Sequence, residues 1–252
     1  MSTKEQNKIN ENEKKNVLEN HKIVSQSEWV KARKDLLIKE KEFTILRDQF
    51  NQKRRDLPWV QVDKEYIFDG PNGKQNLLEL FDGRSQLIVY HFMYDPNWNA
   101  GCPSCSFWAD NFNEICIHLN QRDVTMIAVS RAPYNKIDAY KKRMGWKFKW
   151  VSSYNTDFNY DYHISFTSEE LAKNKAFYNY IDHANPGTER EGVSIFYKNS
   201  SGRIFHTYST YARGIDILNT AYNYLDLVPK GRDEAGYEFP QYWVRRHDEY
   251  GK

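Results

Sequence analysis

Two cysteines separated by two residues are the part of this sequence with the clearest chemistry. Cys102 and Cys105 enclose Pro103 and Ser104, a spacing typical of dithiols that alternate with a disulfide. We predict a helix start here because proline suits a first helical turn. The free N–H groups and dipole of that turn stabilise a thiolate on Cys102, the predicted nucleophile. Cys105 is the predicted resolving thiol, which attacks a mixed disulfide or sulfenic acid on Cys102.

The same two cysteines are also half of a tetrahedral zinc site. The sequence has no second C-x-x-C, so His91 and His206 are the candidates for further ligands. Metal binding therefore stays open, although the redox interpretation expects no metal and no cofactor. The third cysteine, Cys116, is predicted to be a buried core thiol on the same helix, some 16 Å along it by helix rise.

Three residues are candidates for contacts with a substrate. Trp98 lies in the loop before Cys102, where it either shapes access to the dithiol or packs in a plain turn. Arg131 follows a predicted buried strand, and the carboxyl ends of parallel strands are where open α/β folds place their sites. Arginine there attracts an anionic ligand or a thiolate, or else forms a surface salt bridge.

The third candidate is His206, in a polar segment rich in Tyr, His and Asp. We expect this segment, residues 203–213, to line a pocket next to Cys102 together with residues 157–163. Such a pocket suits a small-molecule thiol, disulfide or oxidant better than a protein partner.

The elements that position these residues follow from the hydrophobic pattern. A near-continuous apolar run, 86–93, predicts a strand covered on both faces, and a second run at 124–129 follows a helix over about 103–120. This spacing indicates a βαβ unit with parallel strands. Residues 193–197 and 203–208 flank turn residues and predict an antiparallel hairpin. Further helices are expected over about 136–144, 168–180 and 214–225. The order predicts an α/β, thioredoxin-like three-layer fold with a central mixed sheet.

An N-terminal helix and a C-terminal extension are added to that fold. Ser27 is the predicted helix cap, and Pro58 ends the helix. Its apolar residues recur every seven positions and predict packing on the main domain or, as a homodimer, on a second copy; they are Trp29, Leu36, Phe43, Phe50 and Leu57. We divide the chain into a disordered lead at 1–22, a helical extension at 23–58, a thioredoxin-like domain at 59–226 and an extension at 227–252.

Composition excludes several classes of protein. The 252 residues carry a net charge of +2, far from the basic excess of nucleic-acid-binding proteins. No long apolar run is present that would span a membrane. Three cysteines and a polar start lacking a secretory signal predict a cytoplasmic location.

Several segments resemble a bacterial thioredoxin-like family catalogued as domain of unknown function 899. The resemblance extends over roughly 24–250 and implies a thioredoxin-like fold with a suspected thiol function. The segments that carry it are Gly101-Cys102-Pro103-Ser104-Cys105-Ser106-Phe107-Trp108-Ala109-Asp110, Ser130-Arg131-Ala132-Pro133, Arg143-Met144-Gly145-Trp146, Asp157-Phe158-Asn159-Tyr160-Asp161, residues 205–214 and residues 243–250.

Two departures from the thioredoxin pattern bear on activity. Thioredoxins usually carry Trp before the first cysteine and a cis-proline before the strand that faces the dithiol; here those positions hold Gly101 and Glu191-Gly192. The peroxiredoxin pattern P-x-x-x-T-x-x-C is also missing, since Asp95 and Asn99 replace its Pro and Thr. The sequence predicts a thiol–disulfide oxidoreductase, with a non-catalytic, thioredoxin-like binding or sensing module, metal-binding or not, as the alternative.

Overall fold

The computed structural model describes residues 19–184 and 187–251, which form two compact units. One unit comprises residues 19–57 and 222–242, and the other comprises residues 58–221 and 243–251. Most of the predicted N-terminal lead, residues 1–18, lies outside the described residues. Among the described helices, none combines the length and the hydropathy that crossing a membrane requires.

The first unit is built on a 30-residue helix, α2 (Gln26–Arg55). Its cap is Ser25, so the prediction of Ser27 is wrong. The reason is a capping box: the Glu28 N–H donates to Ser25 Oγ at 3.3 Å, and the Ser25 N–H donates to Glu28 Oε2 at 3.0 Å. Only Ser25 has a glutamate three residues later, which this reciprocal pair needs.

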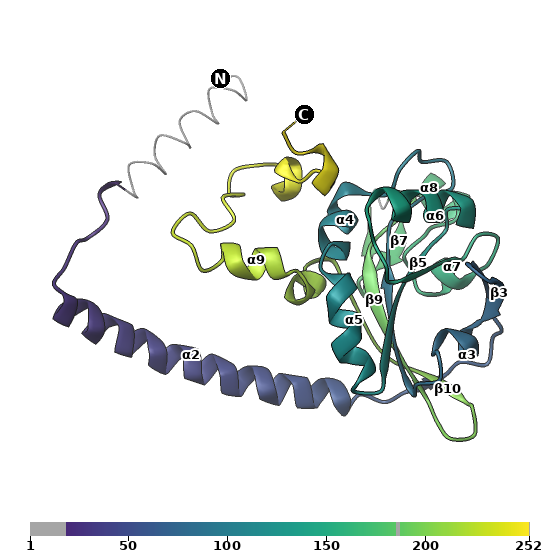
Figure 1. The fold of residues 1–252 in the computed structure, drawn as a ribbon, viewed down its shortest axis with the longest axis horizontal. Coiled ribbons are helices and arrows are strands. Elements are labelled where there is room, and N and C mark those ends of the chain that lie inside the picture. The colour runs from purple at the N-terminus through teal and green to yellow at the C-terminus, as the bar shows by residue number, and fades with distance from the viewer. Residues whose placement is uncertain (1–18, 185–186, 252) are drawn as a thin grey trace. The chain divides into compact units, whose positions relative to one another are not determined.

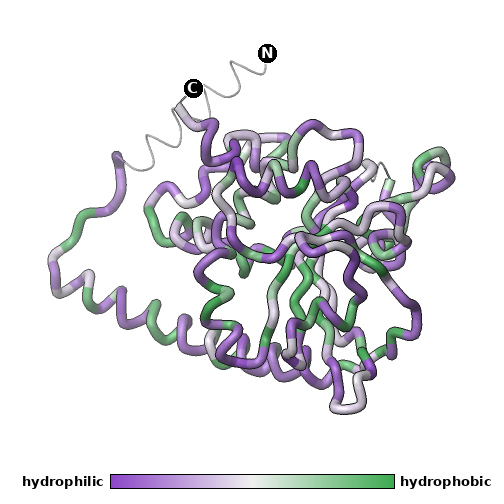
Figure 2. The backbone as a smooth tube through the Cα atoms, turned by 45° about the vertical axis from the view of Figure 1, so that its right-hand side comes forward, coloured by the Kyte–Doolittle hydropathy of each residue, from purple (hydrophilic) through white to green (hydrophobic). Residues whose placement is uncertain are grey.

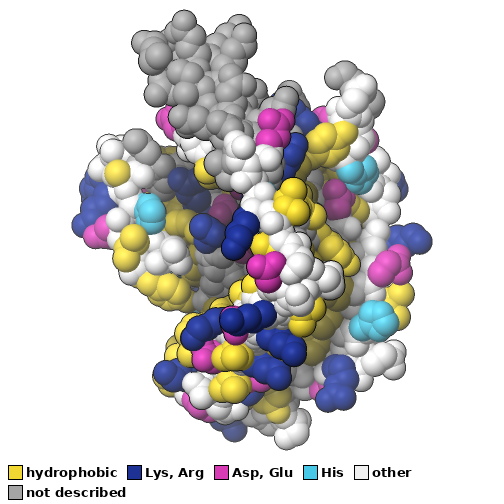
Figure 3. All heavy atoms as spheres, turned by 90° about the vertical axis from the view of Figure 1, so that its left-hand side faces the viewer, with side chains coloured by type: hydrophobic (Ala, Val, Ile, Leu, Met, Phe, Trp, Pro, Cys, Tyr) yellow, Lys and Arg dark blue, Asp and Glu magenta, His cyan; other side chains and the backbone are white. Residues whose placement is uncertain are grey.

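No described residue of α2 is buried. Figure 2 shows hydrophobic and hydrophilic residues alternating along the helix. The five heptad-spaced apolar residues, of which Leu57 lies just past the end of α2, are each exposed by 44–63%. Figure 3 shows Lys and Arg side chains beside Asp and Glu on the face it draws, with hydrophobic side chains between them. Side chains of both charge signs also occur along α2 itself.

The second unit contains an eight-stranded mixed sheet in the order β1-β10-β9-β4-β5-β6-β2-β3. Strand β4 is hydrogen-bonded in parallel to β5 and antiparallel to β9, and β9 and β10 form the predicted hairpin. The strands are β1 (Val60–Gln61), β2 (Ile67–Gly70), β3 (Gly73–Asn76), β4 (Gln86–His91), β5 (Val124–Ser130), β6 (Lys149–Ser152), β9 (Gly192–Lys198) and β10 (Ile204–Tyr211). The parallel and antiparallel neighbours of β4 confirm the thioredoxin-like mixed sheet.

Helices and short elements make up the rest of the described secondary structure. Figure 1 shows α4 and α5 along one side of the sheet. The elements are α3 (Leu77–Leu80), α4 (Pro103–Ala109), α5 (Phe112–Asn120), α6 (Tyr134–Arg143), α7 (Phe158–Asp161), α8 (Ser168–Ala172), the two-stranded β7 (Ala176–Tyr178) and β8 (Ile181–His183), η1 (Ala212–Leu218), α9 (Thr220–Leu225), η2 (Pro240–Trp243) and η3 (His247–Glu249).

Alternation along β4 sends its side chains into two different layers. Leu87 and Val89 belong to a core shared with Phe81, after α3, and Phe158 of α7. Tyr90 points to the other face, where its ring meets that of Phe112 in α5 at 5.0 Å. Both faces of the strand are therefore covered, as its continuous apolar run predicts.

The single helix predicted over 103–120 is in fact two helices, α4 and α5. The Asn111 side-chain amide donates to the carbonyl oxygens of Phe107 and Trp108 at 3.1 and 3.2 Å. An asparagine side chain that takes over carbonyls at a helix end offers the backbone an alternative to continuing the helix. Cys116 consequently lies on α5, apart from the dithiol helix.

The helix predicted over 168–180 is also much shorter, because α8 ends at Ala172. Asn174 has a φ of 50°, the left-handed conformation that stops a helix. The chain then forms the β7–β8 hairpin around Asn179 and Tyr180, which have φ values of 51° and 64°. Two successive positive φ angles match a type I′ hairpin turn. The helix predicted over 214–225 is divided into η1 and α9.

Candidate functional site

Cys102 is the N-cap residue of α4, with Pro103 in the first turn, as the sequence predicts. Its N–H donates to the carbonyl of Met93 at 3.1 Å, and its carbonyl accepts the Ser106 N–H at 3.0 Å. The side chain is partly exposed. The preceding residue is glycine for a steric reason, because a Cβ at Gly101 would lie 2.7 Å from the Phe92 ring.

Cys105 lies one helical turn later and is buried, with 1% of its surface exposed. The N–H of Met93 donates to its sulfur at 3.4 Å. Both cysteines are free thiols. The two cysteines of the dithiol thus differ in exposure, because Cys102 is partly exposed and Cys105 is buried.

The two thiols differ in acidity. Hydrogen bonding from the Cys105 thiol, helped by the N–H groups of Cys105 and Ser104, outweighs burial and lowers the pKa of Cys102 to about 7. Burial raises the pKa of Cys105 well above its usual value, and the neighbouring Cys102 adds to this effect. At neutral pH about half of the Cys102 sulfur is therefore ionised, whereas the Cys105 sulfur keeps its proton.

Two further residues, Glu191 and Tyr90, interact electrostatically with the dithiol. Neither was identified as a site residue from the sequence. Glu191 disfavours negative charge on both sulfurs, and it receives hydrogen bonds from Tyr178 Oη on its carbonyl oxygen at 2.9 Å and on its carboxylate at 3.3 Å. Tyr90 is fully buried, with its hydroxyl on the dithiol side of β4. Two features of the sequence could have indicated them: Tyr90 places a hydroxyl inside an apolar strand, and Glu191 is an acid at the position where thioredoxins carry the cis-proline.

The C-terminal segment of this unit is attached to the start of the dithiol helix. Arg246 donates to the Gly101 carbonyl from two nitrogens, at 2.7 and 3.2 Å, and to the Tyr140 hydroxyl at 3.0 Å. His247 and the indole N–H of Trp146 both contact the Asp110 carboxylate, at 2.7 and 2.8 Å. This segment therefore positions the peptide unit that immediately precedes Cys102.

Arg131 directly follows β5, at its carboxyl end, and forms ion pairs with two buried acidic residues. Its guanidinium is 2.6 Å from Glu189 and 3.1 Å from Asp95, and it also donates to the Tyr160 hydroxyl. Ser165 donates to the second oxygen of Glu189 at 2.8 Å. Burial raises the pKa of Glu189 to about 7 in spite of the arginine. The ion pair is largely buried, unlike the surface salt bridge considered from the sequence.

His91 and His206 belong to a hydrogen-bonded chain across three strands. His91 Nε2 and Ser194 Oγ lie 2.7 Å apart, Ser194 Oγ and Ser209 Oγ 2.7 Å, and Ser209 Oγ and His206 Nε2 2.7 Å. His91 follows Tyr90 on β4, so its side chain points to the face opposite the dithiol. Within the described ranges, no group of three or more His, Cys, Asp or Glu side chains is arranged to hold a metal ion.

The two polar segments expected to line a pocket do meet each other. The Tyr162 ring is 5.3 Å from the His206 ring, and Tyr211 Oη donates to the Tyr162 carbonyl at 3.1 Å. Tyr162 also packs against His91 at 6.0 Å. The segments therefore come together on the His91 face of the sheet, so the structure does not bring His206 to the dithiol.

Trp98 is partly exposed in the loop before Cys102. The loop is fixed by Lys136, whose ammonium group donates to the carbonyls of Pro96 and Trp98 at 2.7 and 3.1 Å. Cys116 is only half-buried, so its prediction as a core thiol is wrong: its side chain is on the partly solvent-facing side of α5.

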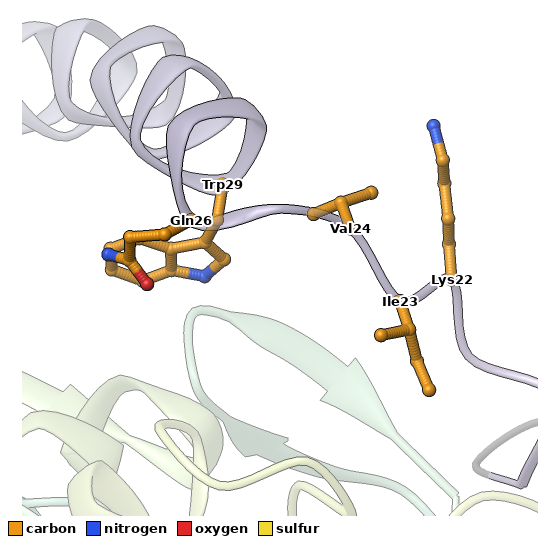
Figure 4. Close-up of a pocket in the computed structure, with 5 residues that line it drawn as sticks. All are labelled: Lys22, Ile23, Val24, Gln26 and Trp29. Atoms are coloured by element: carbon orange, nitrogen blue, oxygen red, sulfur yellow. The ribbon is translucent and has the colours of Figure 1, made fainter.

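A hollow of about 440 Å³ lies at the start of α2, lined by Lys22, Ile23, Val24, Gln26 and Trp29. Figure 4 shows Lys22 and Ile23 pointing in opposite directions from the extended segment that leads to the helix. None of the predicted site residues lines this hollow.

Solved structures similar to this chain include peroxiredoxins. A cysteine-to-serine mutant of PrxQ from Xylella fastidiosa is 14% identical in sequence and superposes with a TM-score of 0.36. The alignment covers 63% of this chain and 89% of the PrxQ chain. The peroxidoxin BcpB from Mycobacterium tuberculosis shares 10% identity and a TM-score of 0.38, covering 65% and 94%. The mitochondrial 2-Cys peroxiredoxin from Plasmodium falciparum shares 14% identity and a TM-score of 0.36, covering 71% and 95%.

A search of curated proteins finds no match. The model of a family described as bacterial protein of unknown function, DUF899, matches residues 18–250. The match covers most of the chain, and the protein belongs to this family.

Proposed function

We propose that this protein is a thiol–disulfide oxidoreductase in which Cys102 is the nucleophile and Cys105 the resolving thiol. The observation that carries the proposal is the difference between the two sulfurs: a partly exposed Cys102 with a pKa of about 7, and a buried Cys105 whose pKa is raised. A thiolate near neutral pH combines nucleophilicity with a useful ionised fraction.

The reaction with a small disulfide has two steps. The Cys102 thiolate attacks one sulfur of the substrate, the substrate S–S bond breaks, and one half leaves as a thiolate. Cys105 then gives up its proton and attacks the Cys102 sulfur, the mixed disulfide breaks, and the second half leaves and takes up the proton. The substrate gains two electrons, which come from the two cysteines as they form the intramolecular disulfide.

A small disulfide or another small oxidant is the proposed substrate class. The support is that Glu191, beside the sulfurs, stands where thioredoxins hold the cis-proline that orients a substrate backbone. Trp98 is the proposed substrate contact, because it is partly exposed in a loop that runs directly to Cys102.

The test is to trap the mixed disulfide. Cys105→Ser protein is incubated with oxidised glutathione or hydroxyethyl disulfide and analysed by intact mass. We expect one adduct on Cys102 that persists, whereas the wild type releases the adduct and forms the Cys102–Cys105 disulfide. Cys116→Ser is the matched control and should behave as the wild type.

Two outcomes would contradict the proposed roles of the cysteines. An adduct on Cys116, or a disulfide between Cys116 and either of the others, would contradict the assignment of roles. Persistence of the adduct in the wild type would show that Cys105 does not resolve it.

A further inference from the structure

The hydroxyl of Tyr90 is a buried polar group to which the reaction described above assigns no role. None of the Tyr90 side chain is exposed. Its ring packs edge-to-face against Phe92 at 6.2 Å and Phe112 at 5.0 Å, which fixes its direction. Among the described residues, the hydroxyl has no hydrogen-bond partner of ordinary geometry. A buried polar group left unpaired costs free energy, so its presence calls for a reason.

The groups around this hydroxyl belong to the dithiol. Burial raises the pKa of Tyr90 well above its usual value, and the next contributions come from the Cys105 thiol, followed by Glu191 and Cys102. Tyr90 therefore keeps its proton. An O–H that cannot ionise can only stabilise negative charge on its neighbours by donating a hydrogen bond.

A backbone donor already points at the sulfur of Cys105. The backbone N–H of Met93 lies 3.4 Å from Cys105 Sγ and favours the ionised form of this thiol. Hydrogen bonds to an ionised acceptor are roughly twice as strong as those between neutral groups. Preorganised donors of this kind stabilise charge at the moment when it develops.

We infer that the Tyr90 hydroxyl and the Met93 N–H form a donor pair for the Cys105 thiolate. This inference rests on the proposed function and deepens it by adding Tyr90 as a catalytic residue of the resolving step. Cys105 carries negative charge when it attacks the Cys102 mixed disulfide, and again when it leaves as the internal disulfide is reduced. The Cys105 proton goes to the departing thiolate of the substrate, whereas Tyr90 keeps its own proton and donates only a hydrogen bond.

Tyr90→Phe is the variant that tests this role, because it removes the hydroxyl and keeps the ring contacts. The full-length variant is mixed with dithiobis(nitrobenzoate), whose coloured thiolate is released first by Cys102 and then by Cys105. We expect an unchanged first phase and a second phase slowed about tenfold, as the loss of one hydrogen bond to a charged group implies. The second-phase rate should also reach its half-maximum at higher pH than in the wild type.

Tyr94→Phe is the matched control. Tyr94 is also buried and directly follows Met93 in the chain, but its hydroxyl donates to the Asn99 carbonyl at 3.4 Å. Its second phase should equal that of the wild type. Equal second phases in Tyr90→Phe and the wild type would overturn the inference while leaving the proposed function in place, whereas a wild type without any first phase would overturn the proposed function.

A titration of the Cys105 thiol, which needs no turnover, tests the role of Tyr90 separately from the proposed function. In protein carrying Cys102→Ser and Cys116→Ser, Cys105 is the sole thiol, and its ionisation is followed by the ultraviolet absorbance of the thiolate. Adding Tyr90→Phe should raise the pKa of Cys105. An unchanged titration, with thermal melts showing a folded protein, would overturn the role of Tyr90 whatever the activity of Cys102.

Discussion

The backbone N–H of Met93 points at the sulfur of Cys105, 3.4 Å away. The carbonyl of the same residue accepts the Cys102 N–H at 3.1 Å. A single peptide segment at the end of β4 therefore holds both cysteines, and it does so through backbone atoms alone. The strand fixes the dithiol independently of the Met93 side chain.

The pH dependence of alkylation follows from the different acidity of the two sulfurs. Cys102 in the Cys116→Ser background should react with iodoacetamide at a rate that rises with pH around a midpoint of about 7, since only the thiolate reacts. Cys105 in a Cys102→Ser, Cys116→Ser background should stay unreactive at this pH, because burial raises its pKa and limits access. Rates measured across pH 5–10 check both statements. Similar midpoints for the two cysteines would contradict this account.

The part of the fold that local patterns encode could be predicted from the sequence. A continuous apolar run with a second run one helix later indicates parallel strands, and β4 and β5 confirm this. Pro103 after Cys102 indicates a helix start, and α4 begins there. These features depend on neighbours in the chain. The homodimer through the N-terminal helix stays a prediction.

Contacts between distant residues explain what the sequence did not reveal. Asp95 and Glu189 lie 36 and 58 residues from Arg131, so nothing in the local pattern shows that this arginine is neutralised. Arg246 reaches Gly101 across 145 residues. The break after α4 depends on a side chain, Asn111, that is equally compatible with an uninterrupted helix. These features depend on side-chain contacts of the folded chain, which the periodicity and spacing of residues in the sequence do not reveal.

Removal of Arg131 should destabilise the protein strongly. Arg131→Gln leaves the buried carboxylates of Glu189 and Asp95 without their positive partner, and breaking a buried pair from one side typically costs about 3–5 kcal/mol. Urea unfolding at pH 7 measures the loss. Asp95→Asn added to Arg131→Gln should recover part of it, since that buried carboxylate is then replaced by a neutral amide. A loss of the size seen for an exposed pair would instead show that the network is dispensable.

Two arginines attach the C-terminal segment to the rest of its unit, Arg246 from the segment and Arg143 from α6, and they should contribute unequally to stability. Arg246→Gln should cost about 1–3 kcal/mol of unfolding free energy, because its side chain is only 17% exposed and it satisfies the Gly101 carbonyl. Arg143→Gln, its matched control, breaks pairs with Asp248 and Glu249 from a side chain that is 39% exposed, and should cost less than about 1 kcal/mol. Arg246→Gln should also shift the pH midpoint of Cys102 alkylation, and Arg143→Gln should not. The reverse order of effects would exclude a positioning role for Arg246.

Acid should destabilise the protein through His91. Burial lowers the pKa of His91 from its usual 6.5 to about 3, with the nearby His206 adding to the effect. The unfolded chain therefore takes up a proton first as the pH falls, so the stability present above pH 6.5 is lost progressively toward pH 3. The slope approaches about 1.4 kcal/mol per pH unit for this one group. The pKa of His206 is also lowered by burial and contributes with the same sign.

Urea unfolding of the wild type and His91→Gln between pH 7 and pH 5 isolates this effect as a difference, because Glu189, whose pKa is raised to about 7, contributes with the opposite sign to both proteins. His91→Gln retains a side chain that can bond to Ser194 and should flatten the dependence, even though its stability at pH 7 is lower than that of the wild type. His118→Gln, at an exposed position on α5, should keep the slope of the wild type. A wild-type slope in His91→Gln would assign the acid sensitivity to other groups and would show that the buried end of the His91–Ser194–Ser209–His206 chain does not control it.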